Sequence, residues 1–121
     1  MPLVLIVDDS PTEVHVLRSA LEENGYATLC AEDGDKGVEL ARERKPDLIL
    51  MDVVMPGLNG YQATRRLHKD PETAGIPVIM VTTKSHETDR IWGMRQGAVD
   101  YIVKPVDPVE LLERARAALA A

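Results

Sequence analysis

Short apolar runs alternate with helical patterns along this 121-residue chain, and no other feature constrains the fold as much. Short apolar runs bounded by turn residues are typical of strands buried on both faces, and helical segments between them favour parallel strands joined by crossover helices. We therefore predict an α/β fold built on a five-stranded, mostly parallel sheet. The runs expected to form its strands are Leu3–Val7, Tyr26–Ala31, Leu48–Met51, Val78–Val81 and Tyr101–Val103.

Capping residues mark the helix boundaries. Ser10 and Glu13 have the spacing of a capping box, with Pro11 at the first helical position, and Asp107 precedes Pro108 in the same manner. These signals predict helices that cover about residues 11–24 and that begin at about residue 108. Between them we expect helices at about 36–44, from the end of a 55–60 loop to about 68, and at about 87–96.

Polar residues follow directly on four of the apolar runs. Asp8 and Asp9 follow the first run, Asp52 the third, Thr82 the fourth and Lys104 the fifth. In an open parallel sheet the strands end at the same edge, and ligands bind in the crevice outside their carboxyl ends. We therefore expect three carboxylates, a hydroxyl and an ammonium group to share one pocket.

The charges in this pocket suggest its chemistry. Three neighbouring carboxylates resist ionisation unless a cation neutralises them, and an all-oxygen donor set without cysteines or paired histidines favours Mg²⁺. Together with Lys104 and Thr82, such an ion can hold a phosphoryl group, and a carboxylate can accept it as an aspartyl phosphate. Asp52 stands alone at the end of the central strand and is the expected nucleophile, whereas Asp8 and Asp9 are the expected metal ligands.

Composition limits the remaining possibilities. Hydrophobic residues make up 45% and charged residues 28% of the sequence, and its length suits one domain spanning residues 1–121. The net charge of −6 argues against a nucleic-acid partner. No apolar run approaches the roughly 20 residues of a membrane span, and the N-terminus lacks the features of a signal peptide, so we expect a cytoplasmic protein without membrane insertion. The single cysteine, Cys30, is expected to be buried.

The chain resembles the receiver domain of bacterial two-component response regulators along essentially its whole length. The motifs that carry the resemblance are the Asp8-Asp9 pair, the block from Asp52 to Gly57, Thr82 at the end of a strand, and the segment from Tyr101 to Pro105. The resemblance implies a flavodoxin-like (βα)₅ fold whose parallel strands lie in the order 2-1-3-4-5.

The same resemblance implies a role for each site residue. Asp52 would be the phosphoacceptor, and the Mg²⁺ ligands would include Asp9 directly, Asp8 through water, and the backbone carbonyl of Val54. Thr82 and Lys104 would contact the phosphoryl oxygens, Tyr101 would be the aromatic switch, and the Lys104–Pro105 bond would be cis. The protein would then be a phosphoacceptor in signalling rather than an enzyme acting on other substrates.

Four stretches are most similar to the small single-domain regulators of the chemosensory system for twitching motility, the PilH type. They are Asp8–Glu13, Val53–Gly60, Thr82–Lys84 and Trp92–Ala98. This similarity implies that a chemotaxis-type histidine kinase or a phosphotransfer domain donates the phosphoryl group, and that the output bears on type IV pilus function. The downstream partner is expected on the face formed by residues 87–96, residues 101–103 and the helix after Asp107.

Three residues near the pocket depart from the commonest family pattern or tune its chemistry. Thr83 stands where family members usually have a small residue. Val54 and Lys84 lie two residues beyond Asp52 and Thr82, at positions that in this family influence how fast the phosphoryl group is lost. Because Val54 cannot orient an attacking water and Lys84 can pair with a phosphoryl group, we expect slow self-dephosphorylation.

Other functions remain open at this point. A phosphohydrolase with an aspartate nucleophile would need a second acid, but Val54 stands two residues after Asp52. A flavodoxin-like nucleotide or flavin binder would need a glycine-rich loop after the first strand, which is absent. A binding module that is never phosphorylated is a third alternative. Among other notable side chains, Trp92 is expected to serve packing rather than as a binding anchor, although aromatic residues near the expected partner face can be interface hot spots. The three histidines are expected at the surface.

Overall fold

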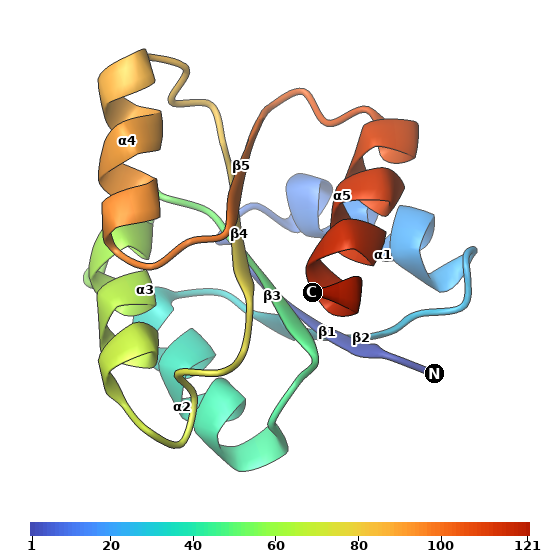
Figure 1. The fold of residues 1–121 in the computed structure, drawn as a ribbon. Coiled ribbons are helices and arrows are strands. Elements are labelled where there is room, and N and C mark those ends of the chain that lie inside the picture. Colours follow the sequence, from blue (N-terminus) through green and yellow to red (C-terminus); the bar gives the residue numbers. More distant parts are fainter.

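The computed structural model describes all of residues 1–121 and contains five strands and five helices that alternate along the chain (Figure 1). The strands are β1 (Leu3–Val7), β2 (Ala27–Ala31), β3 (Leu48–Met51), β4 (Val78–Thr82) and β5 (Asp100–Val103). The helices are α1 (Pro11–Glu22), α2 (Gly34–Arg44), α3 (Gly60–Lys69), α4 (Glu87–Arg95) and α5 (Pro108–Ala120). The predicted alternation of strands and helices is confirmed.

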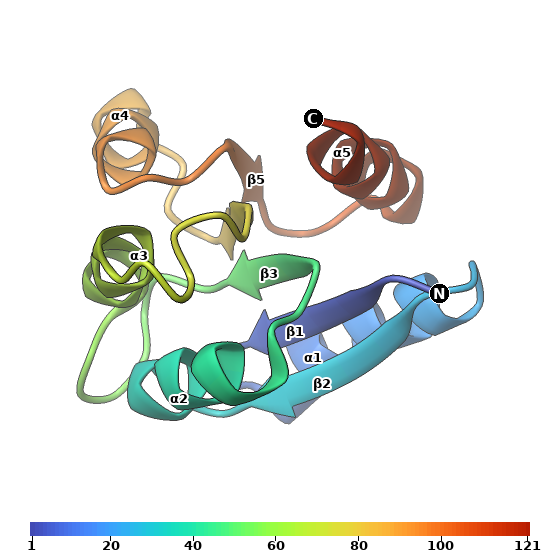
Figure 2. The same ribbon diagram turned by 60° about the horizontal axis from the view of Figure 1, so that its bottom comes forward.

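The five strands form one parallel sheet in the order β2-β1-β3-β4-β5, which confirms the predicted topology. Helices α1 and α5 cover one face, and α2, α3 and α4 cover the other (Figures 1 and 2). The register pairs Val7 with Met51 and Thr82 with Val103. The carboxyl ends of the four strands that carry the predicted site residues therefore meet at one edge.

Both faces of the sheet are buried, and this explains the continuous apolar runs. Along β1, Leu5 and Val7 contribute to the core under α2 and α3, whereas Val4 and Ile6 contribute to the core under α1 and α5. All four side chains are completely buried. A strand with apolar neighbours on both faces needs no polar alternation, so the runs end only where the chain leaves the sheet.

The helix ends follow their capping residues. Ser10 Oγ accepts a hydrogen bond from the Glu13 amide at 3.3 Å, and Asp107 Oδ1 accepts one from the Val109 amide at 3.0 Å. The structure places the start of α2 two residues earlier than predicted, because the Asp33 side chain caps it. It also ends α1 two residues earlier than predicted, at Glu22.

The structure leaves Trp92 51% exposed, which contradicts the packing role expected for it. Helix α4 approaches the sheet through its neighbour Gly93, where an added Cβ would lie 3.3 Å from ring carbons of Tyr101. Cys30 is half-buried rather than buried, and the three histidines are exposed, as expected. None of the helices combines the length and the apolar character that crossing a membrane requires.

Candidate functional site

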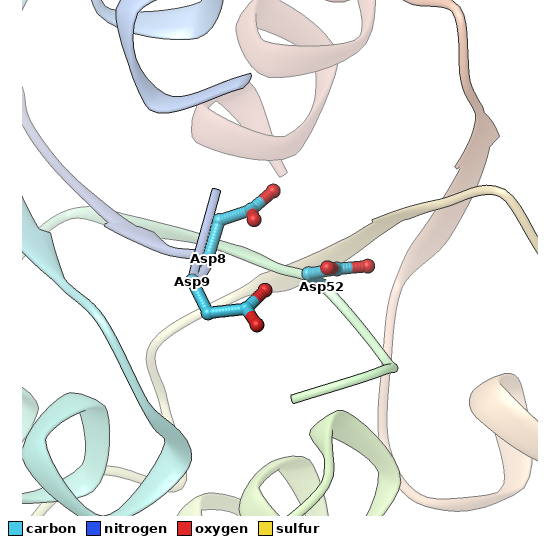
Figure 3. Close-up of side chains that lie close together, drawn as sticks. All are labelled: Asp8, Asp9 and Asp52. Atoms are coloured by element: carbon cyan, nitrogen blue, oxygen red, sulfur yellow. The ribbon is translucent and has the colours of Figure 1, made fainter. Parts of the chain in front are cut away.

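The charged residues predicted to share a pocket come together at the carboxyl ends of the strands. Ligand atoms of Asp8, Asp9 and Asp52 all lie within 4.8 Å of one another, and Figure 3 shows their carboxylates extending to the same side. The Nζ atom of Lys104 lies 2.8 Å from Oδ2 of Asp8 and 3.7 Å from Oδ2 of Asp52. Residues from three strand ends therefore form one acidic site, with an ammonium group bridging two of its carboxylates.

Backbone hydrogen bonds hold these carboxylates in place. The Asp52 amide donates to the carbonyl oxygen of Val7 at 2.9 Å, which fixes the end of β3 against the end of β1. The Ser10 amide donates to Oδ1 of Asp8 at 2.9 Å, and the Val53 amide donates to Oδ1 of Asp52 at 2.8 Å. Asp8 and Asp52 thus each have one carboxylate oxygen bound by a backbone amide and the other oxygen facing the ammonium group.

Burial governs the charges of the site. The side chains of Asp8 and Lys104 are 2% and 7% exposed and that of Asp52 is 10% exposed, whereas Asp9 is open to solvent. Burial raises the pKa of Asp52 above its ordinary value of 3.8 and the Asp8 carboxylate raises it further, although the ammonium group, a backbone amide and a hydroxyl oppose the rise. Burial alone would lower the pKa of Lys104, but its hydrogen bond to Asp8 and the nearby carboxylates raise it overall. The lysine therefore stays charged, and ionised Asp52 carries an electrostatic penalty.

The other predicted site residues lie at the ends of β4 and β5. Thr82 is completely buried, and its hydroxyl oxygen accepts a hydrogen bond from the Lys84 amide at 3.3 Å. Tyr101 is 6% exposed, and its hydroxyl donates to the Lys84 carbonyl oxygen at 2.8 Å. The Val54 side chain is 58% exposed beyond Asp52. The Lys104–Pro105 bond is cis, as expected.

The acidic cluster suits a hard divalent cation. Its side chains offer only carboxylate oxygens, and neither histidine nor cysteine belongs to the cluster. Such a donor set favours Mg²⁺ or Ca²⁺ over zinc, and a divalent charge would offset the repulsion that raises the pKa of Asp52. The residues present therefore fit the magnesium ion that the sequence predicts.

Sequence reasoning did not single out Gly60, which packs directly against the backbone of the candidate nucleophile. Its amide donates to the Val53 carbonyl oxygen at 2.9 Å, and an added Cβ would lie 2.0 Å from the carbonyl oxygen of Asp52. Asn59 and Gln62 form a capping box at this point and so fix the start of α3. The Asn-x-x-Gln spacing was the available signal.

Neutralising Asp52 is expected to stabilise the unmodified fold. Asp52→Asn removes a buried charge next to Asp8 but leaves Lys104 paired with Asp8, so no buried ion loses its only partner. A gain of about 1 kcal/mol would raise the melting temperature by roughly 4 °C in a domain of this size. Thermal unfolding at neutral pH, without divalent cations, measures the difference.

The pH dependence of this gain checks its cause. The pKa of Asp52 is higher in the folded protein than in the unfolded chain. The electrostatic penalty of its buried charge is therefore absent at a pH below the pKa of the unfolded state and complete at a pH above the pKa of the folded state. The advantage of Asp52→Asn should therefore shrink as the pH falls toward about 3. A variant that is less stable than the wild type at neutral pH would contradict the electrostatic argument.

Comparison with known proteins identifies the family. Residues 4–116 match the response regulator receiver domain family. Protein PilH of Pseudomonas aeruginosa is 61% identical over 120 residues, which cover 99% of each chain. The DNA-binding dual master transcriptional regulator RpaA of Synechocystis sp. is 43% identical over 119 residues, and the present chain spans 49% of that longer protein.

Solved structures show the same fold. A putative response regulator from Chloroflexus aurantiacus has a TM-score of 0.95 at 33% identity, with 99% of this chain and 98% of that chain covered. The receiver domain of the sensor histidine kinase PA1611 from Pseudomonas aeruginosa, which has a magnesium ion coordinated in its active-site cleft, has a TM-score of 0.92 at 30% identity, with 99% and 98% covered. The chain therefore belongs to the family of response regulator receiver domains.

Proposed function

We propose that residues 1–121 act as one receiver domain that accepts a phosphoryl group on Asp52 in a reaction dependent on Mg²⁺. The observation that carries this proposal is the buried Lys104 ammonium group, 2.8 Å and 3.7 Å from carboxylate oxygens of Asp8 and Asp52. Receiver domains take phosphoryl groups from histidine kinases, and the donor proposed here is a chemotaxis-type histidine kinase or a phosphotransfer domain.

In the proposed reaction a carboxylate oxygen of Asp52 attacks the phosphorus atom of a phosphohistidine. An O–P bond forms, the P–N bond breaks, the released imidazole takes a proton from water, and the chain keeps an acyl phosphate. Lys104 and Thr82 bind the phosphoryl oxygens, and the buried site limits competition from water. Later attack by water on phosphorus restores the carboxylate and releases inorganic phosphate.

The proposed metal ligands are Asp8, Asp9, Asp52 and the backbone carbonyl of Val54, with Asp8 acting through water. Receiver domains bind Mg²⁺ at an acidic pocket, and the three carboxylates found within 4.8 Å of one another support such a site here. When bound, Mg²⁺ supplies positive charge that offsets the carboxylates and the incoming phosphoryl group.

Intact-mass measurement tests the proposed reaction. The wild-type protein is incubated with acetyl phosphate, a small phosphodonor, in the presence of Mg²⁺ or of excess chelator. We expect one phosphoryl group per chain with Mg²⁺, stable in acid and labile in base, and none with chelator. Multiple turnover of an unrelated phosphate ester would instead support a phosphohydrolase, and no phosphoryl uptake at all would support a binding module that is never phosphorylated.

The phosphoryl group is expected to be lost slowly, because the exposed Val54 side chain cannot orient an attacking water. Val54→Asn places a polar group there and should shorten the phosphoryl lifetime about tenfold, less than the roughly 100-fold that a positioned general base supplies. Val99→Asn is a matched control, because Val99 is 50% exposed at the amino end of β5, whereas Val54 is 58% exposed. Equal lifetimes in the two variants would rule out this role for Val54.

We propose that the partner binds the face formed by α4, β5 and α5. Exposed apolar side chains on this face support the proposal: Ile91, Trp92, Met94 and Val103. The phosphoryl group would offer new acceptors to the Thr82 hydroxyl, which now accepts a hydrogen bond from the Lys84 amide. Formation of that bond would move the loop between β4 and α4, and Tyr101 would follow through its bond to the Lys84 carbonyl oxygen. Phosphorylation would thus change the position of α4 by a population shift.

Thr82→Ala is expected to weaken this switch without blocking phosphoryl uptake. Trp92 is the only tryptophan and lies half-exposed on α4, so its fluorescence reports on that helix. The phosphorylation-dependent change in emission should fall by roughly half or more in Thr82→Ala, because the hydroxyl no longer links the phosphoryl group to the loop. Intact mass confirms equal phosphoryl occupancy. An undiminished emission change at equal occupancy would contradict the switch.

The 61% identity to PilH over 99% of both chains supports a role in type IV pilus chemosensory signalling and twitching motility. Introducing the gene for this chain into a strain that lacks its PilH relative tests this role. Restored twitching zones with the wild-type gene, but not with an Asp52→Asn gene, would support it. Failure of a well-expressed wild-type chain to change motility would argue for another output.

A further inference from the structure

Tyr61, the second residue of α3, joins two helices that lie on the same side of the sheet (Figure 1). Its hydroxyl donates a hydrogen bond of 3.2 Å to the carbonyl oxygen of Asp89 in the first turns of α4. Tyr101 donates its own hydroxyl to the Lys84 carbonyl oxygen at 2.8 Å. Two tyrosines from different elements, α3 and β5, therefore hold the segment 84–89 at two carbonyl oxygens.

The two tyrosine rings also form one packed unit with α4. Tyr61 packs against the core cluster that contains Tyr101, and burial raises the pKa of both hydroxyls, so both remain donors at neutral pH. Gly93 lies directly on the Tyr101 ring, because a Cβ there would come within 3.3 Å of two ring carbons. In this arrangement α4 has two contacts with the tyrosines. Gly93 packs against the buried Tyr101 ring, and the Asp89 carbonyl oxygen accepts the hydrogen bond from the Tyr61 hydroxyl.

Tyr61 is also tied to the candidate phosphoacceptor. It directly follows Gly60, whose amide donates to the Val53 carbonyl oxygen at 2.9 Å and whose Cα packs on the carbonyl group of Asp52. The Asn59–Gln62 capping box fixes the backbone on both sides of this contact. The position of the Tyr61 hydroxyl is therefore set by the same backbone that positions Asp52.

We propose that Tyr61 is a positioning residue for α4: its hydrogen bond to Asp89 favours the arrangement in which Tyr101 is buried. This inference rests on the proposed function, in which phosphorylation changes the position of α4. A hydrogen bond made in only one of two arrangements shifts their equilibrium by its differential contribution, roughly three- to tenfold for a bond of this kind. Tyr61 would then influence the position of α4 from α3, whereas Thr82 and Tyr101 influence it from β4 and β5.

Tyr61→Phe tests the proposal because it removes only the hydroxyl. Amide hydrogen exchange in the unphosphorylated protein should become about three- to tenfold faster across residues 84–93, while exchange in β1 and β3 stays unchanged. The matched control is Tyr26→Phe, since Tyr26 packs against the core on the opposite face of the sheet. Equal exchange in Tyr61→Phe and the wild type would overturn the proposal.

A second measurement separates positioning from general destabilisation. In the unphosphorylated proteins, the Trp92 emission of Tyr61→Phe should lie closer to that of the phosphorylated wild type than the emission of the unphosphorylated wild type does. Faster exchange throughout the sheet, or unchanged Trp92 emission, would argue against a positioning role. If the wild type gains no phosphoryl group, the proposed function fails, and the exchange measurement alone still decides whether Tyr61 holds α4.

Discussion

Asp52→Asn is expected to abolish phosphoryl uptake from acetyl phosphate in the presence of Mg²⁺. The amide has no anionic oxygen to attack phosphorus, and no other carboxylate of the cluster has the same setting: the side chain of Asp8 is bound to Lys104 at 2.8 Å, and Asp9 is open to solvent. The rate of uptake should fall by at least about 10³-fold, below detection by intact mass. The fold itself should remain intact, since this variant is expected to be the more stable one.

Asp47→Asn is the matched control, because Asp47 precedes β3 at the end opposite Asp52. Its carboxylate accepts a hydrogen bond from the Leu3 amide at 2.7 Å, and an asparagine oxygen can accept the same bond. This variant should take up phosphoryl groups at the wild-type rate. A phosphoryl group found on Asp52→Asn, or on the wild type in excess chelator, would show that Asp52 is not the acceptor or that Mg²⁺ is not required.

That the site residues lie together at one edge of the sheet could be predicted from the sequence, because this depends only on topology. Asp8, Asp52, Thr82 and Lys104 each come at or just after the end of a parallel strand, and parallel strands in one sheet end at one edge. No side-chain detail enters that argument. The strand order itself came from the family resemblance, since several orders are compatible with the same alternation of strands and helices.

Features that depend on how helices face the sheet could not be predicted. Trp92 stands in a short helix whose pattern does not distinguish an inner from an outer face, and the only buried residue of α4 is Gly93. A glycine gives no hydrophobic signal, yet here it is the point of closest approach to Tyr101. The bond from Tyr61 to Asp89 likewise joins residues 28 positions apart and follows from the packing of two helices.

Gly60→Ala is expected to cause the largest loss of stability among the variants considered. An added Cβ would lie 2.0 Å from the carbonyl oxygen of Asp52, 2.8 Å from its carbonyl carbon and 2.8 Å from Cα of Val53. All three neighbours are backbone atoms, so no side-chain rotation can relieve the contact. Either α3 or the Asp52 loop must move, and the free energy of unfolding should fall by about 3 kcal/mol or more.

Gly75→Ala is the matched control for the loss of stability in Gly60→Ala, because both variants add one methyl group. An added Cβ at Gly75 would meet nothing within 4 Å, so the free energy of unfolding should change by no more than about 0.5 kcal/mol. Urea titrations of the two variants and the wild type measure the difference. If α3 shifts to accommodate the methyl group, the Tyr61 hydroxyl must shift with it, and exchange across residues 84–93 should rise even under native conditions. Equal stabilities of Gly60→Ala and Gly75→Ala would mean that the start of α3 does not pack tightly against Asp52. The proposed link from Asp52 through Gly60 and Tyr61 to α4 would then be wrong.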